Sequence, residues 1–350
     1  MVDWSIARTI ARVAAGGDGP ASSQIDVVEF CAEMEPYVRD YTDLELDSER
    51  PPAELLTRAG WTETNLESLA HMLDPVAARL EDRLSFAGPL AGALRLGASA
   101  TLAAEVGLVT GYLSHRVLGQ YDVSLLAGDV PPRLLFVGPN LDKAVTDLEV
   151  DAAAFGRWVC AHELTHVHQF GGVPWLREHM SGLLREYLST LEVRIERGSA
   201  GGMPSIPDPG KIVDAFREGG LAALVQSDEQ QALMDRIQAA MAVIEGYSEH
   251  VMDVIGERAI PGHEHLRAAM DRRRRNRSAP ARVIERLLGF NVKLRQYELG
   301  KRFADAVVAE AGIEGLNRVW AEPDALPTLA ELEQASDWLA RVGSDGRAAA

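Results

Sequence analysis

The clearest chemical signal in this chain is the run VCAHELTHVHQF, which contains His162, Glu163 and His166 in the order HELTH. Two histidines four positions apart on a helix are separated by about 400° of rotation, so both imidazoles lie on one face and can bind one ion. Neutral imidazole is a good ligand for Zn²⁺. The carboxylate between them projects beside the ion, where it can accept a proton from a water molecule. The pattern predicts His162 and His166 as zinc ligands and Glu163 as general base, and two histidines without a metal are the alternative.

A catalytic zinc usually has three protein ligands, so a third must come from elsewhere in the chain. His168 lies two residues after His166, about 200° round the helix, and is expected to face away from the pair. The better candidates are Glu245, Glu249 and Asp253, which are spaced four residues apart along one face of a second helix. Carboxylates stacked in this way repel one another, and a nearby cation relieves the repulsion. The alternative is a solvated acidic face without a metal.

Hydrolysis at such a centre also needs a donor for the negative charge that develops on the attacked carbonyl oxygen. Tyr247, His250 and Tyr297 are candidates by residue type, and their spacing does not rank them. The basic run RRRRNR at 272–277 is a solvated helix face or a set of partners for the many acids. A sharper hypothesis pairs one or two of these arginines with the carboxylate stripe or with a substrate carboxylate.

Helical periodicity dominates the segments that must position these residues. Asp151 is a suitable N-cap for a helix over 151–170, which the following glycines end. A long helix is expected over 227–255, and it carries the carboxylate stripe. Thr64 and Glu67 have the spacing of a capping box, which predicts that an earlier helix begins there.

The one clear strand signal lies before the metal helix. The apolar runs VSLLAG at 123–128 and RLLFVG at 133–138 flank a turn rich in Gly and Pro, which is typical of a β-hairpin. Such a hairpin could align an extended peptide by adding it as a further strand. The Gly- and Pro-rich stretch 198–210 is a surface loop or a domain boundary. The surface loop is favoured, because the proposed ligands lie on both sides of this stretch and must meet in one site.

These elements predict a mainly α-helical chain with a small β element and a single domain over 1–342. Its expected parts are a helical N-terminal part (1–117), a strand hairpin (118–140), the metal helix (151–170), the ligand helix (227–255) and a helical C-terminal part (280–342). A flexible tail is expected at 343–350.

Charge and composition exclude several classes of protein. The chain has 35 Lys plus Arg against 52 Asp plus Glu, a net charge of −17, whereas an unspecific nucleic-acid binder needs cationic surface. The least polar stretch, 85–114, contains Arg95 and Glu105, which favours buried helices over a membrane span. The two cysteines lie far apart, and the first residues lack the features of a signal peptide. These features predict a cytoplasmic protein without a disulfide scaffold.

Several motifs resemble those of known proteins. HELTH resembles the HExxH signature of zincin metallopeptidases, and EGYS at 245–248 resembles the segment that carries the third ligand in aminopeptidase-type gluzincins. Over nearly its whole length, the chain is similar to a family of zinc-dependent metalloprotease-like proteins associated with the biosynthesis of a deazaflavin coenzyme. The matching stretches are LGQYD, LLFVGPN, HELTHVHQF with VPWL, EGYSEHVMD, the arginine run and KLRQYELGKRF.

The resemblance implies a zincin-like helical fold with a small sheet beside the metal helix. It implies one Zn²⁺ per chain, held by His162, His166 and Glu245. Glu163 is then the general base, and Glu249 is the alternative third ligand. The implied activity is metal-assisted hydrolysis, so the expected partner is a peptide or small amide substrate rather than nucleic acid or a membrane. The alternatives are an inactive zinc-bearing scaffold protein and an amide hydrolase of cofactor metabolism.

Overall fold

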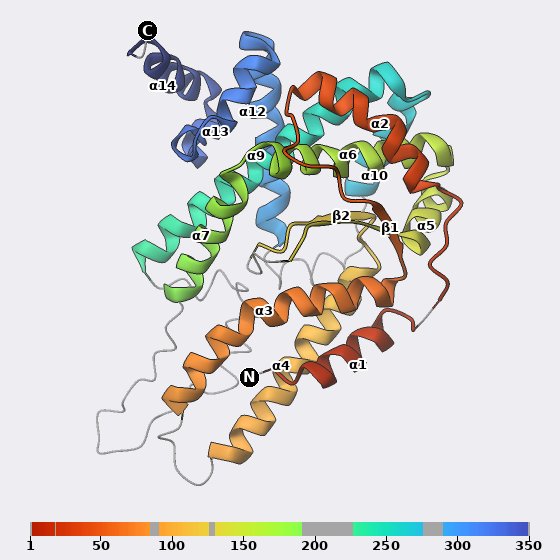
Figure 1. Ribbon diagram of the computed structural model, residues 1–350, viewed down its shortest axis with the longest axis vertical. Helices are drawn as coiled ribbons and strands as arrows, with labels where there is room; N and C mark the ends of the chain where they lie inside the picture. The colour runs from red at the N-terminus through yellow and green to blue at the C-terminus, as the bar shows by residue number, and fades with distance from the viewer. Residues whose placement is uncertain are drawn as a thin grey trace. The chain divides into compact units, whose positions relative to one another are not determined.

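The computed structural model describes residues 2–17, 19–84, 91–125, 130–190, 227–275 and 290–348, and side chains within 2–17, 19–71, 99–125, 130–190, 227–273 and 298–343 (Figure 1). These residues are mainly helical with one three-stranded sheet, which confirms the expected fold class. The chain divides into two compact units, Met1–Met34 with Glu49–Glu163, and Glu35–Ser48 with Leu164–Ala350. The single domain over 1–342 stays a prediction. None of the described helices is long and apolar enough to cross a membrane.

Three helices of the first unit pack side by side: α1 (Trp4–Ala14), α3 (Arg58–Leu84) and α4 (Ala91–Ser114) (Figure 1). Asp3 caps α1 by accepting the N–H groups of Ser5 and Ile6. Two glycines of α4 let it approach α1 closely, because a Cβ at Gly107 would lie 2.6 Å from the carbonyl oxygen of Ala7. Helix α2 (Val27–Thr42) runs through both units and contains Pro36.

Helix α3 begins earlier than the capping-box pattern predicts. Its first residue is Arg58, and the hydroxyl of Thr57 accepts the N–H of Gly60 at 2.8 Å. Thr64 instead lies inside the helix, where its hydroxyl donates to the carbonyl of Gly60. The prediction of a start at Thr64 is therefore wrong, since an earlier threonine already caps the helix.

The sheet has the strand order β1-β3-β2, with β1 (Ala53–Leu56) parallel and β2 (Gly119–Asp122) antiparallel to the central strand β3 (Arg133–Val137). The antiparallel pairing and strand β3 agree with the predicted hairpin, but β2 lies before the predicted first strand at 123–128. Strand β2 ends at Asp122 because a local turn follows it, in which the Asp122 carboxylate accepts the N–H of Ser124 at 3.0 Å and Ser124 adopts a φ of 45°. Residues 126–128 of the predicted strand lie outside the described residues.

Strand β1 was not predicted from the sequence. All four of its residues are only half-buried, so it lacks the alternation of buried and exposed positions that marks a strand. After β3 the chain continues into α5 (Gly138–Leu148) and then α6 (Ala152–Gly172), whose first part belongs to the first unit and whose remainder belongs to the second.

Long helices form the second unit: α7 (Leu176–Thr190), α9 (Asp228–Ala259), α10 (His263–Arg275) and α12 (Phe290–Asn317). Figure 1 shows α7 beside α9, and α12 crossing α9. The crossing is very close, because a Cβ at Gly246 of α9 would overlap the backbone of Gly300 in α12, and a Cβ at Gly300 would overlap the carbonyl of Ala242. Glycine at both positions therefore allows the two helices to approach this closely.

The C-terminal part of this unit consists of short elements. They are η2 (Arg318–Trp320), η3 (Pro323–Ala325), α13 (Leu329–Glu333) and α14 (Ala335–Ala348). Thr328 and Glu331 form a capping box at the start of α13.

Candidate metal centre

Helix α6 carries the HELTH segment in a mostly buried environment. The Asp151 carboxylate accepts the N–H of Ala154 at 2.8 Å and caps the helix, as its position predicts. Phe155, Leu164 and Val167 are buried, whereas His162 and His166 are partly exposed. The apolar residues anchor α6 in the core, and the two imidazoles lie on its more accessible side.

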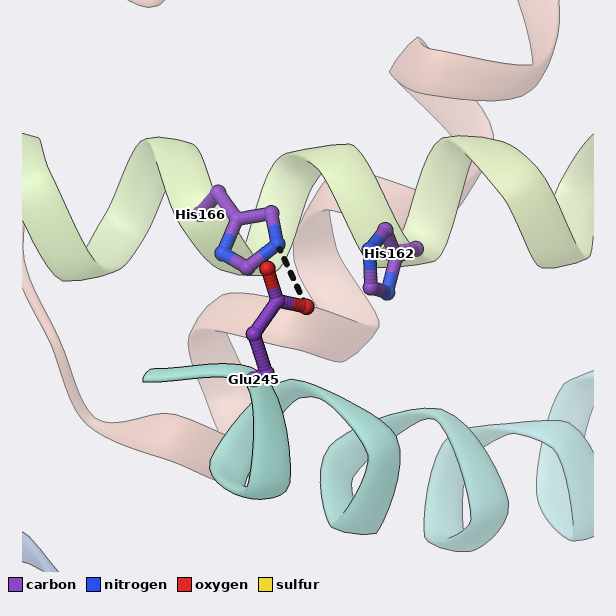
Figure 2. Close-up of side chains that lie close together, drawn as sticks. All are labelled: His162, His166 and Glu245. Carbon is purple, nitrogen blue, oxygen red and sulfur yellow. Dashed lines mark ion pairs between the residues drawn. The ribbon is translucent and has the colours of Figure 1, made fainter. Parts of the chain in front are cut away.

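The structure brings His162, His166 and Glu245 together. One potential ligand atom of each lies within 4.8 Å of the others, and His166 Nε2 lies 3.8 Å from Glu245 Oε2. Figure 2 shows both imidazoles projecting from α6 and the carboxylate reaching them from α9. The side chains of His166 and Glu245 are only 12% and 16% exposed. Two imidazoles and one carboxylate are a common ligand set of catalytic zinc, so this donor set fits the ion that the motif predicts.

Glu163 lies under strand β2 and is only 5% exposed. Its Oε2 accepts the backbone N–H of Tyr121 at 3.0 Å. A Cβ at Gly119 would lie 2.6 Å from Glu163 Cγ and 2.7 Å from Oε1, so the strand passes directly over the carboxylate. Glycine at 119 is what allows this approach, and the strand holds the carboxylate in one orientation.

Strand β2 is at an edge of the sheet, and its outer side faces Glu163. The carbonyl of Leu118 accepts the N–H of Val137 at 2.9 Å, so Leu118 directs its carbonyl towards β3. Because backbone groups alternate along a strand, Gly119 and Tyr121 direct theirs away from β3. The bond from Tyr121 to Glu163 is consistent with this alternation.

Glu249, the alternative third ligand, makes a different contact. Its carboxylate accepts from Arg267 of α10 at 2.7 Å and is 5% exposed. Asp253 lies 3.0 Å from Lys301 and 3.4 Å from Arg267. Burial lowers the pKa of Arg267, but the hydrogen bond and charge of Glu249 and the charge of Asp253 raise it above its usual value. Among the described side chains, Glu245 is thus the carboxylate that meets the histidines.

The carboxylate stripe therefore pairs with a cation that lies before the basic run. Arg267 precedes 272–277 by more than one turn of α10, and its side chain is only 18% exposed where it pairs with Glu249. Side chains from residue 274 to the end of the run lie outside the described residues. The described partners of Glu249 and Asp253 are Arg267 and Lys301, and both lie outside the basic run that the sequence hypothesis named.

Tyr247 is not available as a donor at the metal cluster. Its side chain is 0% exposed, and its hydroxyl donates to Asn317 Oδ1 at 2.8 Å. Its ring packs edge-on against Trp320, and burial raises its pKa far above the usual value. The candidate role as oxyanion donor is therefore wrong, because two residues along a helix turn the side chain by about 200° from Glu245.

His250 and Tyr297 are the other two candidates. His250 is 7% exposed, with Nε2 2.7 Å from the hydroxyl of Tyr41 and Nδ1 2.8 Å from Asp305. The described contacts thus place it in a polar group with these two residues. The backbone of Tyr297 belongs to α12, and its side chain lies outside the described residues.

Several residues around the candidate site were not predicted from the sequence. Gly119 and Tyr121 gave no signal, because their role depends on the path of β2 over Glu163. Gln169 contacts His166, and its position three residues later on the same helix face could have suggested it. His168 faces away as expected, with Nδ1 donating to the carbonyl of Leu44, and burial lowers its pKa.

A helix that carries HExxH, joined by a carboxylate from a second helix, is the arrangement of zincin-type zinc hydrolases. The chain belongs to the zincin-like metallopeptidase family, whose match covers residues 2–339. Membership of this family indicates a zinc hydrolase.

The fold also has a solved relative. The chain is similar to a crystal structure from Chloroflexus aurantiacus, described as a “putative hydrolase with a novel fold”, with 28% sequence identity and a TM-score of 0.72. The match covers 98% of this chain and 99% of that chain. No protein of curated function matches the chain.

Proposed function

We propose that the protein is a zinc-dependent peptidase in which His162, His166 and Glu245 hold one Zn²⁺ per chain and Glu163 is the general base. The observation that carries the proposal is the grouping of three ligand-type atoms within 4.8 Å. His162 and His166 come from α6, the helix that also presents Glu163, and Glu245 comes from α9. The ligand set leaves room for a fourth position, as catalytic zinc sites do.

The chemistry follows from the positions of these groups. A bound Zn²⁺ supplies a Lewis acid that polarises a carbonyl and lowers the pKa of water towards neutrality. Glu163 accepts the proton of the attacking water and delivers it to the leaving nitrogen. The hydrogen bond from the Tyr121 N–H holds the carboxylate in place for both transfers. Low exposure of Glu163 keeps bulk water away from the proton transfer.

Strand β2 supports a peptide as the substrate. It lies at the edge of the sheet, and Gly119 and Tyr121 direct backbone groups to the side where Glu163 lies. Glu163 occupies the N–H of Tyr121, so an extended peptide would pair with the other outward backbone groups of this edge and run past the general base. Binding through main-chain hydrogen bonds favours tolerance of side-chain sequence. A small amide gains nothing from a strand edge.

The test combines metal analysis with Glu163→Gln. We expect the wild-type protein, purified without chelator, to carry one zinc per chain and to cleave a library of unstructured peptides. Glu163→Gln keeps the metal and loses at least about 10²-fold in kcat, the order expected for a general base. His162→Ala and Glu245→Ala lose both metal and activity.

Three other outcomes contradict the proposal. Absence of stoichiometric zinc in the wild type removes the metal site itself. Full activity of Glu163→Gln indicates a zinc-bearing scaffold. Cleavage of small amides without cleavage of peptides indicates an amide hydrolase instead.

A further inference from the structure

We propose that Gln169 is a positioning residue that fixes the tautomer of His166 and fastens it to the helix that carries Glu245. The inference rests on the proposed zinc site, and it adds a residue to which neither the sequence motif nor the family match gives a role. Its steps depend only on residues of the second unit.

Gln169 has two polar contacts inside the core. Its side chain is 0% exposed, with Oε1 2.8 Å from His166 Nδ1. Its Nε2 donates to the backbone carbonyl of Ile244 at 2.9 Å. The amide therefore connects the second histidine of α6 with α9 at the residue directly before Glu245.

The direction of these hydrogen bonds fixes the proton on His166. A backbone carbonyl can only accept, so the amide nitrogen of Gln169 must face Ile244. The opposite amide orientation would place two acceptors against each other. Oε1 of Gln169 must then face His166 and accept, so Nδ1 of the neutral imidazole carries the hydrogen.

The consequence is that Nε2 of His166 keeps its lone pair. This is the nitrogen that lies 3.8 Å from Glu245 Oε2, within the cluster of ligand-type atoms. A histidine ligand is commonly oriented by an acceptor on its other ring nitrogen, which selects the tautomer and raises the basicity of the ligand. Gln169 prepares His166 in this way before any ion arrives.

The same side chain also restrains the third carboxylate. Ile244 directly precedes Glu245, and the next residue, Gly246, is packed against the backbone of Gly300. The backbone of Glu245 is thus held on both sides. Loss of the Gln169 side chain would remove the hydrogen bond to Ile244 and the hydrogen bond to His166 at the same time.

Two substitutions at 169 separate the acceptor from the donor. Gln169→Leu removes both and leaves the Nδ1–H of His166 and the carbonyl of Ile244 without this partner. Gln169→Glu keeps an acceptor for Nδ1–H. Gln230→Leu is the matched control, because Gln230 is also buried and its Nε2 donates to a backbone carbonyl, that of Thr190 at 2.7 Å. It lies about four turns of α9 before Glu245.

The first readout needs no metal. In the metal-free full-length protein with ¹⁵N-labelled histidine, we expect His166, assigned by loss of its signals in His166→Gln, to be the Nδ1–H tautomer. The tautomer should persist in Gln169→Glu and Gln230→Leu and be lost in Gln169→Leu. An Nε2–H tautomer of His166 in the wild type overturns the inference without reference to any variant.

The second readout is zinc affinity, measured by competition with a chromophoric chelator. Gln169→Leu should bind zinc about 10- to 100-fold more weakly than the wild type, the usual effect of removing such a partner. Gln169→Glu and Gln230→Leu should stay within about threefold. Equal weakening in Gln169→Leu and Gln230→Leu would mean that general loss of stability, and not positioning of His166, is responsible, and would overturn the inference.

Failure of the proposed function gives a different result. If the wild type shows the Nδ1–H tautomer and binds one zinc but cleaves no peptide, the role of Gln169 stands and the peptidase proposal fails. If the tautomer is the opposite one while peptides are cleaved, the function stands and the role of Gln169 fails.

Discussion

At the scale of single residues, the candidate site is defined by atoms that restrict one another. Glu163 is held between its own helix and the Tyr121 N–H, and His166 is held by Gln169. Each restraint removes freedom from a side chain before a ligand arrives, which lowers the entropy lost on binding. The geometry of the site therefore depends on the residues that hold Glu163 and His166 as well as on those two residues themselves.

Gly119→Ala tests the restraint on Glu163. The added Cβ would lie 2.6 Å from Glu163 Cγ, so either the strand or the carboxylate must move. Because a displacement of about 1 Å at a catalytic group can cost about 10²-fold in rate, we expect a fall of that order in kcat with the zinc content unchanged. The measurements are steady-state kinetics and metal analysis.

The control for this variant is Gly182→Ala in α7, where a Cβ meets nothing within 4 Å. It should leave kcat unchanged and slightly stabilise the helix. Loss of zinc together with activity in Gly119→Ala would contradict the expected separation between metal binding and proton transfer.

At the scale of elements, the crossing of α9 and α12 positions Glu245. The two helices meet backbone to backbone at Gly246 and Gly300, without side chains between them. Such a contact tolerates no added atoms, since packed interiors do not deform continuously. The third ligand therefore depends on a residue in a helix that carries no ligand itself.

Gly300→Ala tests this dependence. The new Cβ would overlap the carbonyl of Ala242, so α12 must move away from α9. We expect a loss of about 1–3 kcal/mol in the free energy of unfolding, as for other overpacked cores, and weaker zinc binding. Urea denaturation and chelator competition measure the two effects.

Gly343→Ala in α14 is the control, because a Cβ there meets nothing within 4 Å. Wild-type stability in Gly300→Ala would show that the two helices separate without cost, contrary to the close contact.

At the scale of the whole molecule, a metal that binds only the folded state raises its stability. Zinc at a free concentration of about 100 times Kd adds about 2.7 kcal/mol to the free energy of unfolding. We therefore expect the Tm to rise by a few degrees with zinc and to fall with a chelator, as differential scanning calorimetry would measure. Glu163→Gln should show the same shift, whereas Glu245→Ala should show none. A shift that persists in Glu245→Ala would place the bound ion elsewhere.

The sequence predicted the elements with strong local signals. Asp151 caps α6 where expected, and the four-residue spacing placed both histidines on one face. Helix α9 begins at Asp228, next to the start of the predicted range 227–255. The spacing offered Glu245, Glu249 and Asp253 on one stripe, and the family resemblance implied Glu245 as the third ligand with Glu249 as the alternative. What the spacing could not show is that Arg267 pairs with Glu249.

Two of the differences from expectation share one physical cause, which is contact between residues far apart in the chain. Tyr247 was a candidate donor by type, and its buried bond to Asn317 removes it from that role. Strand β1 pairs with β3, far downstream, and its four half-buried residues show no alternation that would predict a strand. Periodicity describes one element at a time and contains no information about which element lies opposite.

The arrangement of the sheet has a consequence for the order of folding. The central strand β3 pairs with β2 nearby and with β1 in the register Ala53 to Leu134. During synthesis β1 emerges long before β3, so it stays without its partner while α3, α4 and β2 are made. Pairing at such a separation in sequence is slow, because a long loop must close first. All three strands have been made once the chain has been extended past Val137. The strand that passes over Glu163 therefore has both other strands of its sheet available before Glu163 itself is synthesised.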